Sequence, residues 1–148
     1  MTSELGFDHG INYKKSDWAK SLSNSTTSGV DIYFDNVGGI ISDEIIDRIN
    51  EKARVLICGQ ISQYNNSEVE LGPRNLRQFL FKRAKLEGFM VYTYEDQYQE
   101  GLDFLINMMN EGELKFKETI VEGIENAPSA FSKLFSGENF GKLLLKIT

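Results

Sequence analysis

Polar side chains and glycines follow two apolar segments of this sequence. Phe34-Asp35-Asn36-Val37-Gly38-Gly39 ends the segment that begins at Val30, and Cys58-Gly59-Gln60-Ile61-Ser62-Gln63-Tyr64 follows Val55-Leu56-Ile57. Amide and hydroxyl groups can hydrogen-bond a ligand, and glycine lets a ligand approach the backbone closely. A simple turn is the alternative interpretation of Asp35 to Gly39 alone. Two such segment ends together favour a ligand site, provided that they are the carboxyl ends of neighbouring parallel strands.

The order of the apolar segments supports this condition. We expect strands at residues 11–13, 30–37, 54–58 and 86–92, and the strand at 30–37 has β-branched and aromatic residues on both faces. Helices are expected at residues 16–22, from an N-cap at Ser42 through Ile49, at 74–85 and from Tyr98 to a stop at Gly112. Residues 116–121, a helix capped by Asn126 and ended by Gly137, and residues 141–147 complete the chain. Strands that alternate with helices predict an α/β fold, with a parallel sheet covered on both faces.

The bulk properties exclude several classes of protein. The chain has 148 residues and a formal charge of -6, as expected for a soluble globular protein with one core. The acidic balance argues against nucleic-acid and membrane-surface partners. We interpret the one basic cluster as a solvated helix face; it consists of Arg74, Arg77, Lys82, Arg83 and Lys85. No apolar run could span a membrane, and the first residues do not resemble a signal peptide, so a cytoplasmic location is expected.

Cys58 is the only cysteine and His9 the only histidine. An internal disulfide therefore cannot form, and a structural zinc site lacks its cysteine and histidine ligands, so no metal site is expected. We interpret Cys58 as a small buried thiol and His9 as a surface residue.

Several longer motifs resemble one enzyme family. They include Asp31-x-Tyr-Phe-Asp-Asn-Val-Gly-Gly39, Cys58-Gly-x-Ile-Ser-x-Tyr-Asn65, Phe79-x-x-Lys-Arg-x-x-x-x-Gly-Phe89, Glu118-Thr-Ile-Val-Glu-Gly123 and Glu138-Asn-Phe-Gly-Lys142. They make the chain similar to the carboxyl-terminal part of the zinc-independent medium-chain dehydrogenases/reductases. The nearest branch holds leukotriene B4 dehydrogenase, prostaglandin reductase and curcumin reductase. The resemblance implies hydride transfer from NADPH to the carbon–carbon double bond of a small enone or enal.

The resemblance also implies roles for individual residues. Tyr13 would lie by the adenosine end of NADP(H), Asn36 would hydrogen-bond the cofactor, and Asn139 would close over it. Main-chain groups of Phe89, Met90 and Val91 would meet the nicotinamide carboxamide. Cys58, Gly59, Gln60, Ile61, Ser62, Gln63 and Tyr64 would run along the ribose and phosphate. The phenol of Tyr64 would either lie nearest the oxygen of the developing enolate, as the one catalytic candidate, or hydrogen-bond a ribose without proton transfer.

The chain departs from the family's pattern, because it contains no G-x-G-x-x-G phosphate turn. The resemblance then implies an incomplete Rossmann-type, doubly wound sheet with strands that correspond to the third to sixth. Residues 1–112 would be the carboxyl-terminal portion of a dinucleotide-binding domain. Residues 113–148 would form a strand-helix-strand segment that in relatives returns to a GroES-like substrate domain. We expect weak or no NADPH binding and no activity by this chain alone.

Self-association is a further expectation from this resemblance. The strand at 30–37 would become a sheet edge, and the strand from Leu86 to Tyr92 would pair with a second copy to give a homodimer. The alternative to an oxidoreductase fragment is a non-catalytic, self-associating α/β module that binds no nucleotide.

Overall fold

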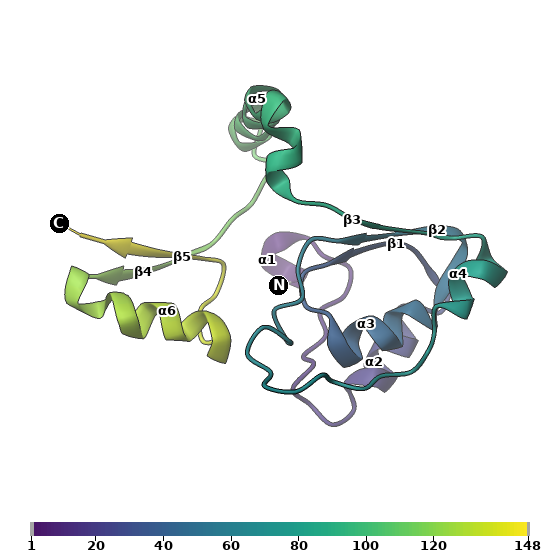
Figure 1. Cartoon of the computed structure of the whole chain (residues 1–148). Helices are drawn as coiled ribbons and strands as arrows, with labels where there is room; N and C mark the ends of the chain where they lie inside the picture. Colours follow the sequence, from purple (N-terminus) through teal and green to yellow (C-terminus); the bar gives the residue numbers. More distant parts are fainter. Residues whose placement is uncertain (1, 148) are drawn as a thin grey trace. The chain divides into compact units, whose positions relative to one another are not determined.

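The computed structural model describes residues 2–147 and divides into two compact units. The first, which we call the sheet unit, is Phe7–Glu95. The second, the terminal unit, consists of the residues from Asp96 onward together with Ser3–Gly6. The short helix α1 (Thr2–Leu5) lies at the amino end of the chain (Figure 1).

The sheet unit contains three parallel strands in the order β1-β2-β3. They are β1 (Val30–Asp35), β2 (Ile49–Ile57) and β3 (Lys85–Gly88). The register pairs Asp35 with Ile57 and Ile57 with Gly88, so the three carboxyl ends meet at one edge of the sheet. The helices α2 (Trp18–Ser25), α3 (Gly39–Ile46) and α4 (Arg77–Lys82) lie on one face of this sheet (Figure 1). The predicted α/β fold with parallel strands is confirmed.

A small core lies between the sheet and these helices. Its fully buried members are Ile49, Ala53 and Val55, and Tyr33, Ile57, Phe79 and Ala84 pack against them. The other face of β1 is uncovered, since Ile32 is 60% and Phe34 52% exposed. The prediction that this strand becomes a sheet edge is confirmed. The prediction that both of its faces are buried is wrong, because burial on the second face needs a layer that the sheet unit does not supply.

Other boundaries also differ from the predictions. Residues 11–13 form no strand, because no described segment pairs with them. Ser42 is not an N-cap but lies inside α3, which begins after Gly38, a residue with a left-handed φ of 72°. Ile49 opens β2 instead of ending the helix. The helix α4 and the strand β3 are both shorter than expected, and β3 leads into the 3-10 segment η1 (Val91–Gln97).

The terminal unit begins with the helix α5 (Tyr98–Asn110). It continues with β4 (Glu118–Glu122), the 3-10 turn η2 (Ile124–Asn126), α6 (Ala127–Ser136) and β5 (Lys142–Lys146). The strands β4 and β5 are parallel and α6 connects them. Gly137 ends α6 in the left-handed conformation, so this predicted strand-helix-strand segment and its stop are confirmed.

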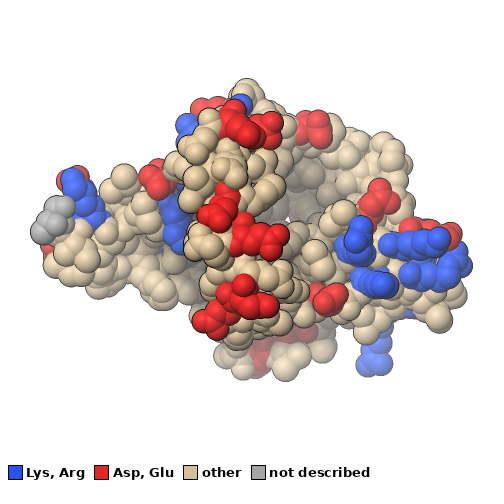
Figure 2. Space-filling view, turned by 90° about the horizontal axis from the view of Figure 1, so that it is seen from above, with Lys and Arg blue, Asp and Glu red and all other residues tan. Residues whose placement is uncertain are grey.

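Basic side chains gather around α4, on the right of Figure 2, with acidic ones beside them. Arg83 forms an ion pair with Glu51, and Arg48 forms one with Glu44 at 2.7 Å. Arg74, Arg77 and Lys85 are exposed, but the predicted single helix face is wrong, because Arg74 precedes α4, Arg83 is its C-cap and Lys85 belongs to β3. Within residues 2–147, no helix has both the length and the apolar character needed to cross a membrane.

Candidate functional site

An open groove of about 490 Å³ lies at the carboxyl ends of β2 and β3. Its walls come from the end of β2 and the loop that follows, and from the end of β3 and the start of η1. The residues that line it are Ile57, Cys58, Gly59, Gln60, Tyr64, Gly88, Phe89, Met90 and Thr93. Carboxyl ends of parallel strands are where α/β sheets bind ligands, and the groove has the size of a small-molecule site.

Backbone hydrogen bonds join the end of β1 to the loop after β2. The carbonyl of Asp35 accepts the N–H groups of Cys58 at 2.8 Å and Gly59 at 3.1 Å. The carbonyl of Asn36 accepts the N–H of Ile61 at 3.2 Å. Three successive carbonyls take part, because the carbonyl of Val37 accepts both the N–H of Ser62 at 3.1 Å and its hydroxyl at 2.6 Å. The backbone of residues 58–62, of which Cys58, Gly59 and Gln60 line the groove, is therefore held by the turn after β1.

The carboxylate of Asp35 holds the same turn from its other side. It is 2% exposed, and its Oδ1 accepts the N–H groups of Val37 and Gly38, both at 2.9 Å. The hydroxyl of Tyr33 donates to Oδ1 at 2.9 Å, and that of Ser42 donates to Oδ2 at 2.5 Å. Burial opposes the charge of this carboxylate, but the four hydrogen bonds outweigh it and lower the pKa of Asp35 below its ordinary value. Burial is also the main cause that raises the pKa of Tyr33, so this phenol stays protonated and donates.

Two glycines let these segments approach each other closely. A Cβ on Gly38 would lie 3.1 Å from the side chain of Gln60, and the φ of 72° disfavours any other residue there. A Cβ on Gly59 would lie 3.1 Å from the hydroxyl of Tyr64 and 3.4 Å from the carbonyl oxygen of Asn36. The backbone conformation requires glycine at position 38, whereas at position 59 the close contact is with the end of an exposed side chain.

The aromatic side chains of the groove are differently constrained. Phe89 donates its N–H to the carbonyl of Ile57 at 3.1 Å, and its ring meets the rings of Phe34 and Tyr94 edge-on. Tyr64 is 65% exposed, and its hydroxyl oxygen accepts the N–H of Gln60 at 3.0 Å. Because this contact uses only the oxygen, the hydroxyl hydrogen of Tyr64 remains available to an acceptor in the groove.

Most residues predicted from the sequence meet at this groove. Cys58, Gly59, Gln60, Tyr64, Phe89 and Met90 line it. Ile61, Ser62 and Gln63 belong to the same loop, Val91 follows Met90, and the side chain of Asn36 lies near Gly59. Tyr13 is exposed and does not line the groove. Asn139 belongs to the terminal unit, where its amide donates to the carbonyl of Gly141 at 3.0 Å. The predicted small buried thiol of Cys58 is only half-buried.

Two residues of the site were not foreseen. Thr93 lines the groove from η1 and lies just after Tyr92, the last residue of the predicted strand. The sequence predicts Asp35 as one member of a polar turn, whereas its carboxylate is the centre of a buried network. The sequence feature that points to this network is a single acid at the end of an apolar strand, with glycine three residues later.

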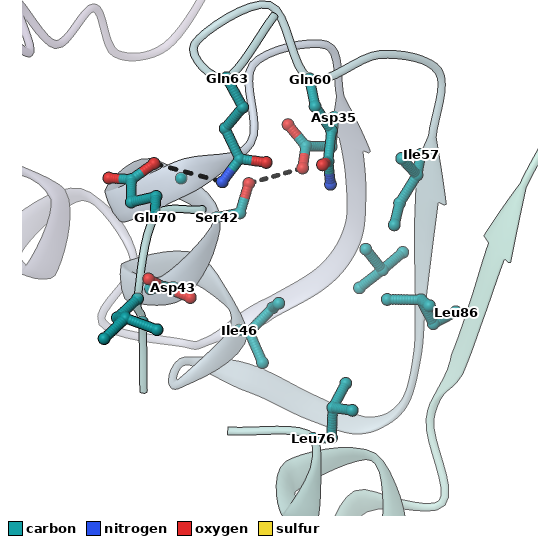
Figure 3. Close-up of a pocket in the computed structure, with 14 residues that line it drawn as sticks. Asp35, Ser42, Asp43, Ile46, Ile57, Gln60, Gln63, Glu70, Leu76 and Leu86 are labelled. Atoms are coloured by element: carbon teal, nitrogen blue, oxygen red, sulfur yellow. Dashed lines mark hydrogen bonds between the residues drawn. The ribbon is translucent and has the colours of Figure 1, made fainter. Parts of the chain in front are cut away.

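A second cavity of about 250 Å³ lies between α3, the sheet and the loop after β2 (Figure 3). Asp43 and Glu70 line its polar end, where Gln63 donates to Glu70 at 3.2 Å. Desolvation, and then the charges of Glu70 and other nearby acids, raise the pKa of Asp43. The cavity also has apolar lining residues, which are Ile46, Val55, Ile57, Leu71, Leu76 and Leu86.

The groove fits the uncharged portion of a dinucleotide better than its phosphates. It offers backbone groups, the hydroxyls of Tyr64 and Thr93 and aromatic or aliphatic walls, but none of its nine lining residues is charged. Phosphates call for arginine, lysine or a helix N-terminus. In the part of the chain that the structure describes, no group of three or more histidine, cysteine or acidic side chains could hold a metal ion.

Comparison with known proteins identifies the relatives of this chain. Residues 5–145 match the family described as zinc-binding dehydrogenase. All of the chain aligns at 46% identity with 44% of YfmJ of Bacillus subtilis, which is named as an NADP-dependent oxidoreductase. All of it also aligns at 37% identity with 43% of a tobacco (Nicotiana tabacum) protein named 2-alkenal reductase (NADP(+)-dependent).

A solved structure has the same fold. The crystal structure of CurA from Vibrio vulnificus in complex with NADPH matches 97% of this chain, with a TM-score of 0.90 and 38% identity. The chain covers 44% of that structure. It therefore spans less than half the length of the relatives that it matches.

Proposed function

We propose a function on the ground that the chain belongs to the zinc-binding dehydrogenase family, as the match of residues 5–145 shows. It is the carboxyl-terminal part of an NADP(H)-dependent oxidoreductase that reduces the carbon–carbon double bond of an enone or enal. The observation that carries the proposal is the groove at the carboxyl ends of β2 and β3. Relatives named for NADP dependence and for alkenal reduction, and a similar structure solved with NADPH, support it.

The residues of the groove divide the work. Bound NADPH would supply the hydride. Asn36, Cys58 to Tyr64, and Phe89 to Val91 would hold the cofactor, with Gly59 permitting close contact to the backbone. The hydroxyl of Tyr64 already accepts the N–H of Gln60, so its hydrogen can be donated to a substrate oxygen or to a ribose. Tyr13 and Asn139, which do not line the groove, keep the roles that the resemblance implies as predictions.

We expect these 148 residues alone to bind NADPH weakly, because the groove offers no cationic side chain to the phosphates. The test is a titration of the isotope-labelled chain with NADPH, followed by amide resonances. Shifts should be confined to residues 58–64 and 89–93, with half-saturation far above low micromolar concentration. Asn36→Ala should weaken the response, and Asn107→Ala, which changes an exposed asparagine of α5, should not. Low-micromolar affinity would contradict the weak binding, and unchanged groove amides would refute nucleotide binding here.

Turnover is a separate test. The chain should not oxidise NADPH in the presence of an enone above a buffer control. Activity above that control would mean that these residues suffice for the reaction.

The exposed edge of β1 favours a second candidate, a non-catalytic module that associates with itself and binds no nucleotide. Either candidate is compatible with a homodimer through residues 86–92, because β3 forms the other sheet edge. Light scattering should give a mass above the 16.8 kDa of one chain. Replacing Ile32 and Phe34 by lysine should preserve a dimer formed through β3 and dissociate one formed through β1. A monomer at high micromolar concentration would refute both modes.

The remaining expectations stay predictions. They are the division into a nucleotide-binding portion at residues 1–112 and a returning segment at 113–148, independence from zinc, a cytoplasmic location and the lack of nucleic-acid and membrane partners.

A further inference from the structure

The carboxylate of Asp35 does not line the groove, but it accepts hydrogen bonds from the turn after β1. That turn is hydrogen-bonded to the loop after β2, which contains one wall of the groove. Its carboxylate accepts the N–H groups of Val37 and Gly38 and the hydroxyls of Tyr33 and Ser42 (Figure 3 shows the bond from Ser42). All four donors lie within the sheet unit, on β1, on the turn after it and on α3.

The turn uses its carbonyl groups in the opposite direction. The carbonyls of residues 35, 36 and 37 accept the N–H groups of Cys58, Gly59, Ile61 and Ser62. The N–H groups of the turn therefore bind the carboxylate of Asp35, while its carbonyls bind the groove wall. Since a peptide plane is rigid, fixing the N–H of Val37 also fixes the direction of the carbonyl of Asn36, which accepts Ile61.

We propose that Asp35 is a positioning residue for the cofactor surface: its ionised carboxylate orients the turn at 35–38, and this turn sets the backbone of residues 58–62. The inference rests on the proposed function for the identity of the ligand, whereas the coupling between carboxylate and groove wall can be tested without any ligand.

The surroundings make the charge of Asp35 essential to this role. Tyr33 on β1 donates to the carboxylate, and the other titratable groups that line the same cavity are Asp43 on α3 and Glu70 on the loop after β2. None of the residues that line the shared cavity is basic, so hydrogen bonds and not an ion pair hold the carboxylate. Protonation would weaken four charge-assisted bonds at once, and two of them hold the turn directly.

A pH titration of the labelled chain without nucleotide tests the coupling. The amides of Val37 and Gly38 should shift with one midpoint, below the ordinary range of an aspartate, and those of Ile61 and Ser62 should follow it. Ser42→Ala should move this common midpoint upward, and Glu70→Gln should leave it in place. If Val37 and Gly38 titrate and Ile61 and Ser62 do not, the proposal is wrong. The wild-type titration gives this answer even if a variant at Asp35 fails to fold.

The second measurement uses NADP+, which is stable in acid. Asp35→Asn should retain dispersed resonances, lose the common midpoint and weaken the groove's response to NADP+ by about tenfold, the effect of losing one charge-assisted bond. Asp31→Asn, an exposed acid on the same strand, should leave the response unchanged. Equal responses in wild type and Asp35→Asn would overturn the positioning role. If wild type gives no response to NADP+ while its amides still share the midpoint, nucleotide binding by this groove is refuted and the coupling stands.

Discussion

Gly59→Ala tests whether Gly59 and the hydroxyl of Tyr64 lie as close to each other as the structure indicates. A Cβ here would lie 3.1 Å from the hydroxyl of Tyr64, so this hydroxyl has to retreat by a few tenths of an ångström. The exposed ring of Tyr64 can turn away at little cost, and Gly59 lacks the left-handed φ that would strain alanine. Alanine also restricts the unfolded chain, which stabilises by about 0.4–1 kcal/mol. We therefore expect the free energy of unfolding to change by less than about 1 kcal/mol.

Displacement of the Tyr64 hydroxyl should change the amide resonance of Gln60, its hydrogen-bond partner. The N–H of Gln60 donates to that oxygen at 3.0 Å, so its amide resonance should shift in Gly59→Ala and also in Tyr64→Phe. Urea unfolding gives the stability, and Gly101→Ala on α5, where a Cβ meets nothing within 4 Å, is the matched control. That control should gain up to about 1 kcal/mol from helix propensity. A loss above about 2 kcal/mol in Gly59→Ala, or an unmoved Gln60 amide in both variants, would refute the geometry of this wall.

Three further predictions concern stability. Lys52 has a left-handed φ of 62° where the pairing of β1 with β2 is irregular, so Lys52→Gly should raise the urea midpoint by an amount worth about 1 kcal/mol. Val55 is 1% exposed in the core, and Val55→Ala removes two buried methyl groups, which should cost about 2 kcal/mol of unfolding free energy; an unchanged midpoint would contradict the packing. The lowered pKa of Asp35 contributes stability that is complete above the pKa of an unfolded aspartate and is lost as the pH falls through the folded pKa. Unfolding midpoints measured across acidic pH should show this loss in wild type and a flatter dependence in Asp35→Asn.

The sequence predicts well those elements whose pattern is local. The β-branched and aromatic run from Val30 identifies β1, and the apolar stripe of residues 98–109 identifies α5. Gly137 stops α6 because a left-handed C-cap is a property of one residue and its neighbours. The polar and glycine-rich segments after β1 and β2 also identify the groove wall, because strand ends of a parallel sheet must share an edge.

The errors arise where distant contacts decide. Ile11 and Tyr13 are strand-forming residues, but a strand exists only through its pairing partner. Ser42 has the composition of an N-cap, and a contact seven residues away, with Asp35, places its hydroxyl inside the fold instead. Exposure of Ile32 and Phe34 likewise depends on whether a second layer covers that face of the sheet, which no local pattern encodes.

At the end of β1, residues 34–39 depend both on local sequence pattern and on contacts with distant residues. Phe34 is exposed and Asp35 is buried, so the alternation of the strand turns the acid inward, toward Ser42. The left-handed φ values of Gly38 and Gly39 then reverse the chain into α3, which brings the N–H groups of Val37 and Gly38 onto the carboxylate. The N–H groups of Val37 and Gly38 are used by the carboxylate of Asp35, so the turn binds the neighbouring loop through its carbonyl groups. A carbonyl is an acceptor, so that loop has to supply N–H donors. The loop after β2 does so at four of the five positions from Cys58 to Ser62. The glycines and the acid therefore serve the architecture of the turn, whereas the exposed side chain of Asn36, beside Gly59, takes no part in these contacts.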